Sequence, residues 1–216
     1  MRSLALACIA LFALSGCQSA YFAAMEKAGI PKRQMLVSRV NDARDAQQDA
    51  KQHFSNALQN YRSVVQFTGG DLEKRYNALN DDYQASEKSA AAVHHRIGAI
   101  ENVADALFDE WSDELDQYSN KDLRAASAKE LARTQTEYRE LLQKMKTAES
   151  RIEPVLSVLR DHVLFLKHNL NAQAIGALKG ENSNLQGNVD QLLKDMQRSI
   201  DDSNAFVRHL QGSATQ

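Results

Sequence analysis

An apolar seam that repeats every 3.5 residues is the feature of this chain that most constrains its fold. Alternating steps of four and three residues from Leu72 to Trp111 reach twelve positions, and eleven of them are apolar or aromatic. The twelve are Leu72, Tyr76, Leu79, Tyr83, Ser86, Ala90, Val93, Ile97, Ile100, Ala104, Leu107 and Trp111. This period is typical of a coiled-coil seam and predicts one long helix with a narrow buried stripe. The phase then slips to Leu115 and Tyr118, which predicts a stutter.

Three further seams have the same period. The first comprises Leu36, Val40, Ala43, Gln47, Ala50, Phe54, Ala57, Tyr61, Val64 and Thr68. The second comprises Leu131, Thr134, Tyr138, Leu141, Met145, Ala148, Ile152, Val155, Leu159, His162 and Leu166. The third comprises Leu185, Val189, Leu192, Met196, Ser199, Ser203, Phe206 and Leu210. Because one helix cannot bury such a stripe alone, the helices must fold on one another or dimerise.

Two short breaks between the seams predict tight turns. Gly69 and Gly70 can take positive φ, and Asp71 can cap the helix that follows. Ser119-Asn120 is the corresponding capping candidate farther along the chain. Turns this short favour an internal bundle in which consecutive helices are antiparallel.

Helix breakers are scarce, so the helices are expected to be long. Pro31 and Pro154 are the only prolines, and Gly98 is the only glycine between Asp71 and Ile175. Pro154 lies within a seam without shifting its phase, which favours one kinked helix over two separate helices. We therefore predict an all-α chain, an elongated antiparallel helical bundle or coiled coil of about four long helices.

The bundle is expected over residues 34–211. A short amphipathic helix is expected before it, ended by Gly29 and restarted by Pro31, and a flexible tail after it over residues 212–216. The amide- and alanine-rich stretch from Asn169 to Ala177 suits either close helix contact or a bend, and an ordinary linker is the alternative for this stretch and for the short N-terminal segment.

The N-terminal residues resemble the signal of a bacterial lipoprotein. Arg2 precedes an apolar run over residues 4–14, and this run is shorter than the roughly 20 residues that a membrane span needs. The run ends in the sequence LSGC at residues 14–17, which resembles a lipobox, whose cysteine becomes the lipidated first residue of the mature protein. The resemblance implies a signal peptide over 1–16, a lipid on Cys17 and a membrane-proximal segment over 17–33.

Residue 18 bears on the location of the anchor. Enteric lipoproteins that stay in the inner membrane carry Asp at this position, whereas this chain carries Gln18. The resemblance therefore implies a cell-envelope protein that is lipid-anchored in the outer membrane and faces the periplasm. Lys32-Arg33, close to the lipid end, would add a weak attraction to anionic head groups.

The residue types supply no recognisable reaction centre. Cys8 lies in the segment to be removed and Cys17 would carry lipid, so the mature chain has no thiol for a disulfide or a nucleophile. A formal net charge of −2 with both signs interspersed does not favour nucleic acid as a partner. The sequence has no Gly-rich phosphate loop and no HExxH motif. We predict no catalytic residues, no cofactor and no metal site, and hence no enzyme.

The polar clusters are interpreted as structural. Six acids around Trp111 are expected to cover a solvated helix face: Asp105, Asp109, Glu110, Asp113, Glu114 and Asp116. His94-His95 lacks the i,i+4 spacing of a zinc pair. His162 falls on a seam and is interpreted as an interface histidine, with a pH-sensitive contact as the alternative. Gln47, Ser199 and Ser203 also fall on seams, where they either set the helix register or line a cavity.

Several segments carry a family resemblance. YFAAMEKAGIPKR from residue 21, VNDARDAQ from residue 40 and FTGG from residue 67 are three of them. RIGAIENVADALFDEW from residue 96 and FLKHNLNAQAIGAL from residue 165 are two more. Together with Cys17, they resemble a family of proteobacterial helical lipoproteins of unknown function. The resemblance spans nearly the whole mature chain and implies no activity and no binding residues.

Two functions follow as hypotheses. The first is a membrane-anchored, non-enzymatic scaffold or adaptor whose long helices bind another envelope protein, with homo-oligomers also possible. The alternative is a ligand-binding or sensor bundle with an internal pocket among Gln47, His162 and their polar neighbours.

Overall fold

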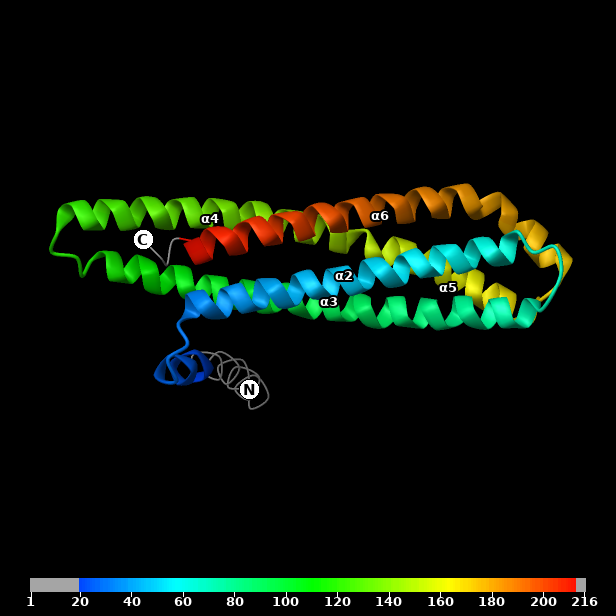
Figure 1. Ribbon diagram of the computed structural model, residues 1–216, viewed down its shortest axis with the longest axis horizontal. Coiled ribbons are helices and arrows are strands. Elements are labelled where there is room, and N and C mark those ends of the chain that lie inside the picture. The colour runs from blue at the N-terminus through cyan, green and yellow to red at the C-terminus, as the bar shows by residue number, and fades with distance from the viewer. Residues whose placement is uncertain (1–19, 213–216) are drawn as a thin grey trace, which may run out of the picture.

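The computed structural model describes residues 20–212, all of which lie in helices or in the turns between them (Figure 1). A short helix over residues 20–27 is followed by five longer ones: α2 (Lys32–Val65), α3 (Leu72–Leu115), α4 (Lys121–Ser150), α5 (Ile152–His168) and α6 (Ala172–Gly212). The expected signal peptide over 1–16, Cys17 and residues 213–216 of the expected tail lie outside the described residues.

The long helices form an antiparallel four-helix bundle. α2 packs against α3 and α6, and α4 and α5 each pack against α3 and α6 on the opposite side. α4 and α5 follow one another along the rod and together take the fourth position of the bundle (Figure 1). The 44 residues of α3 extend about 65 Å at 1.5 Å per residue. The prediction of an elongated all-α bundle is confirmed.

The seams become the core of the rod. All residues of the seams from Leu131 to Leu166 and from Leu185 to Leu210 are buried. The two ends of the predicted pattern are wrong, because α2 ends at Val65 and α3 ends at Leu115. Thr68 and Tyr118 therefore lie in turns and are exposed. The predicted slip of the α3 seam reaches Leu115, which packs against the core, but it does not continue to Tyr118.

The predicted turn residues cap their helices. Gly69 and Gly70 have φ of 155° and 102°, and the Asp71 carboxylate accepts a hydrogen bond from the Lys74 amide at 2.9 Å. The Asn120 side chain accepts from the amides of Asp122 and Leu123 at the start of α4. Gly29, with φ of 82°, ends the short helix before α2.

The expectation of one kinked helix at Pro154 is wrong. The helix is interrupted three residues earlier, at Arg151, which separates α4 from α5. Proline has no amide hydrogen to donate to the Ser150 carbonyl, and its ring crowds that turn, so the helical ladder ends there and restarts with Pro154 in the first turn of α5. Arg151 itself keeps helical angles (φ −87°, ψ −13°), so α5 continues along the rod.

No helix among residues 20–212 combines the length and the apolar character that crossing a membrane requires.

Candidate functional site

A buried polar contact joins α2 to α6 in the middle of the bundle. Gln47 and Ser199 are both fully buried, and the Ser199 hydroxyl donates to Gln47 Oε1 at 2.9 Å. Ser203, one turn further along, donates to the Ser199 carbonyl at 2.8 Å. Gln47 Nε2 is buried without a hydrogen-bond partner. The direct bond matches the interpretation that these residues set the register of the two helices.

A second buried polar contact joins α2, α5 and α6. The His162 ring on α5 stacks on the Tyr61 ring of α2, with centroids 5.0 Å apart and planes 16° apart. The Tyr61 hydroxyl donates to the Leu178 carbonyl of α6 at 2.9 Å. Burial, reinforced by Glu181, raises the pKa of Tyr61 to about 12. Burial lowers the pKa of His162, and the charges of Glu181 and Asp161 only partly oppose this shift.

The other sequence candidates lie mainly on the surface. Among the six acids near Trp111, all except Glu110 are exposed, which confirms the solvated face. His94 and His95 are exposed as well, and His94 Nδ1 lies 2.6 Å from Glu149. Within residues 20–212 no group of three His, Cys, Asp or Glu side chains is placed to hold a metal ion.

Lys32 and Arg33 bind other parts of the protein. Lys32 Nζ lies 2.5 Å from Glu26 and 3.1 Å from Glu110, so it joins the short helix to both α2 and α3. Arg33 Nε donates to the Leu210 carbonyl at the end of α6. Both charged groups are therefore engaged in contacts within the protein, which weakens the attraction to lipid head groups that the sequence suggested.

The hairpin between α3 and α4 extends past the ends of α2 and α6 (Figure 1). We call residues 112–126 the α3–α4 tip, and all of them except Leu115 are exposed. The tip is closed by its own bonds. Trp111 Nε1 donates to the Ser127 hydroxyl at 2.8 Å, and Arg124 contacts both the Leu115 carbonyl and the Asp116 carboxylate. Two helices thus form an ordered protrusion without support from the other two.

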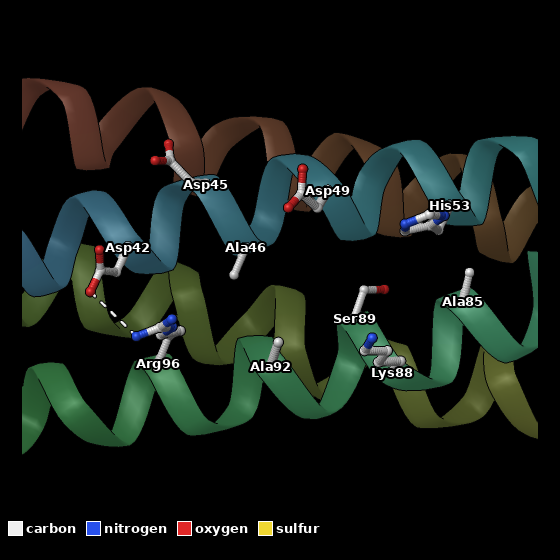
Figure 2. Close-up of a pocket in the computed structure, with 10 residues that line it drawn as sticks. All are labelled: Asp42, Asp45, Ala46, Asp49, His53, Ala85, Lys88, Ser89, Ala92 and Arg96. Carbon is white, nitrogen blue, oxygen red and sulfur yellow. Dashed lines mark hydrogen bonds and ion pairs between the residues drawn. The ribbon is translucent and has the colours of Figure 1, made fainter.

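A groove of about 550 Å³ runs between α2 and α3 (Figure 2). We call it the α2–α3 groove. It is lined by Asp42, Asp45, Ala46, Asp49, His53, Ala85, Lys88, Ser89, Ala92 and Arg96. Arg96 on α3 contacts Asp42 on α2 at 3.3 Å, and this ion pair bridges the two helices at one end of the groove. Ala46 and Ala92 point toward each other across the groove (Figure 2). Because both of these facing residues are alanines, no large side chain fills the space between α2 and α3 at their position in the groove.

The two walls of the α2–α3 groove carry opposite charges. Three aspartates follow the α2 wall, whereas Lys88 and Arg96 follow the α3 wall. Asp45 is paired with Arg44 at 2.8 Å, but the exposed side chains of Asp49 and Lys88 form no hydrogen bond or ion pair with another described residue. His53 Nδ1 is buried without a hydrogen-bond partner. The groove therefore presents a polar surface whose charges are only partly neutralised.

The α2–α3 groove was not predicted from the sequence, although the sequence of α2 carries a signal for it. Asp42, Ala46, Asp49 and His53 each lie one position before a buried seam residue of α2. A stripe of small and charged residues beside a coiled-coil seam faces the flank of the neighbouring helix. Reading this stripe on both α2 and α3 would have indicated a groove, but only if the register of the hairpin were known.

The comparisons with known proteins give the family of the chain. A family model described as "Protein of unknown function (DUF2959)" matches residues 21–210, from the short helix before α2 to the end of the last seam. A search of curated proteins returned no match.

Proposed function

The chain belongs to the DUF2959 family, which carries no assigned activity, and we propose from its geometry that it is a lipid-anchored envelope protein that acts as a non-enzymatic scaffold. In this proposal, Cys17 carries the lipid and the rod presents the α3–α4 tip to another envelope protein. The sequence before residue 20 supports the anchor, and the exposed tip supports the contact with a partner.

The tip is the observation that carries the scaffold role. Leu123 is 57% exposed and Tyr118 is 42% exposed, although both are large apolar side chains. They lie next to the exposed acids Asp113 and Glu114 and next to Asp116, which is paired with Arg124 of the tip. An ordered protrusion with an apolar centre and a charged margin resembles the composition of protein interfaces. The matching partner surface is apolar with basic residues around it.

The place of the short N-terminal helix adds a geometric reason. It joins the rod in the same half as the α3–α4 tip, whereas the turns after α2 and α5 lie at the opposite end (Figure 1). An anchor at Cys17, three residues before this helix, would hold the tip near the membrane. The proposed partner is therefore a protein that exposes a basic and apolar surface close to the same membrane.

Site-specific photo-crosslinking in the native cells tests the partner contact. A photoreactive residue at Leu123 is compared with one at Leu164, which is 52% exposed but lies on α5 toward the other end of the rod. We expect one defined adduct from Leu123 and none from Leu164. Absence of an adduct at Leu123, or equal adducts at both positions, would contradict the proposed role of the tip.

The anchor is tested separately with Cys17→Ala. Metabolic labelling with palmitate should label the wild-type chain and not the variant. The variant should also leave the membrane fraction and lose the adduct at Leu123. If the wild-type chain takes up no palmitate, the lipid anchor is refuted while the contact at the tip can still be assessed.

A further inference from the structure

We propose that the α2–α3 groove is a self-association surface. In the proposed parallel dimer, the α2–α3 face of one copy packs against the same face of a second copy of this chain. The groove belongs to neither the tip nor the anchor, so this inference goes beyond the proposed scaffold contact. The inference depends on the positions of the charged residues along the axes of α2 and α3 and on the small side chains between the two helices.

The charges of the groove complement those of a second groove in one orientation. A two-fold axis that runs parallel to the helices, above the groove, places α2 of each copy over α3 of the other. Such a rotation keeps every residue at its own level along the rod. The acidic wall of one copy, with Asp45 and Asp49, then faces the basic wall of the other, with Lys88 and Arg96 (Figure 2).

Asp49 and Lys88 form the central contact of this arrangement. Along the groove, Asp49 lies between Ala92 and Ser89, and Lys88 follows Ser89, so the two charges occupy neighbouring positions (Figure 2). Both side chains are exposed and lack a partner among the described residues of their own chain. The two-fold axis pairs each Asp49 with Lys88 of the other copy, which gives two identical ion pairs.

The floor of the groove permits close approach. Ala46 and Ala92 point into the groove, and Ala85 lines it further along (Figure 2). Small residues at a helix contact allow helix axes to come within the short end of the usual 8–10 Å range.

The alternative two-fold axis, perpendicular to the helices, is disfavoured for two reasons. It places α2 over α2 and brings the aspartates of the two copies together, which is repulsive. It also sends the two N-termini to opposite ends of the dimer. The parallel axis keeps both N-termini at one end, as two chains anchored in the same membrane require. This second reason alone depends on the proposed anchor.

Charge reversal tests the dimer, with sedimentation velocity of the full-length chain in detergent at low salt and submillimolar protein. Asp49→Lys and Lys88→Asp should each weaken the dimer about tenfold or more, because each reversal turns two attractions into repulsions. A chain with both changes should dimerise like the wild type. An equimolar mixture of the two single variants should also dimerise, because each supplies the charge that the other lacks.

Lys179→Asp is the matched control, since Lys179 is an exposed lysine on α6 that does not line the groove. This variant should keep the dissociation constant of the wild type. A wild-type chain that remains monomeric overturns the proposal. A dimer that both single reversals leave unchanged, or a mixture that fails to restore association, overturns it as well. Circular dichroism of every variant checks that the helices are retained.

Discussion

His162 is expected to make the stability of the bundle fall in mild acid. Its ring is 7% exposed and stacked on Tyr61, and its Nδ1 is buried without a hydrogen-bond partner. Protonation would place a positive charge inside the contact between α2, α5 and α6, where only Glu181 and Asp161 oppose the cost of burial. The perturbation that isolates this effect is His162→Phe, which keeps an aromatic ring against Tyr61 and cannot be protonated.

The direction of the pH effect follows from the lowered pKa of His162 in the folded chain. Below the unfolded value of about 6.5, the unfolded chain binds a proton at this residue that the folded chain does not. The contribution of His162 to stability is therefore complete above pH 6.5 and is lost as the pH falls toward the folded pKa. The loss approaches about 1.4 kcal/mol per pH unit within this window.

The assay is urea unfolding of the wild type and His162→Phe between pH 7.5 and pH 5. Other groups titrate in both proteins, so the difference between the two free energies of unfolding isolates His162. Near pH 7.5 the variant should be as stable as the wild type or about 1 kcal/mol more stable, because it removes an unpaired polar atom. In mild acid the wild type should lose stability relative to the variant. Parallel curves across the whole range would refute the reasoning.

Three further predictions concern the core, the ion pair of a buried aspartate and a turn. Leu79→Ala and Leu141→Ala should each lower the free energy of unfolding by about 2 to 5 kcal/mol, because both side chains are at most 2% exposed; shifts near zero in urea unfolding would contradict these core positions. Asp195→Ala should cost about 1 to 3 kcal/mol, since its buried carboxylate accepts from the partly exposed Arg151 at 2.5 Å, and a thermal melt that matches the wild type would contradict this role. Gly70→Ala should cost about 1 to 2 kcal/mol for backbone strain alone, because φ is 102° and nothing lies within 4 Å of an added Cβ. The control Gly180→Ala, at an equally open position inside α6, should instead stabilise by about 0.5 to 1 kcal/mol, and equal signs for the two variants would contradict the argument.

The helices and their buried faces were predictable because they depend on local pattern. A seam with a period of 3.5 residues identifies the face that must leave water, whichever helix covers it. This is why Leu131, Met145, Leu185 and Leu192 are all buried where the seams placed them. The capping roles of Asp71 and Asn120 were predictable for the same reason, since a cap is a contact between residues two or three positions apart.

The candidate site was much less predictable because it depends on how separate helices align. Predicting the α2–α3 groove requires the position of Asp49 along the bundle relative to Lys88, and no pattern within α2 alone gives that position. The burial of Asp195 was missed for a similar reason, because its partner Arg151 lies 44 positions away at a helix break. The prediction of one continuous helix at this break was wrong. The apolar seam keeps its period through Pro154, although the run of backbone hydrogen bonds is interrupted there.

The polar contacts inside the rod explain how one alignment is chosen among several. A long apolar seam tolerates shifts of one heptad, since a shift exchanges one set of aliphatic contacts for another. A shift of α6 along α2 would separate Ser199 from Gln47, and it would remove the Leu178 carbonyl from the Tyr61 hydroxyl. Each loss leaves a buried polar group unpaired, at a cost of about 1 to 3 kcal/mol. The Asp195–Arg151 pair applies the same constraint between α6 and the α4–α5 break. These contacts therefore fix α6 relative to α2 and to the start of α5, and through α4 they fix how far the α3–α4 tip extends beyond the bundle.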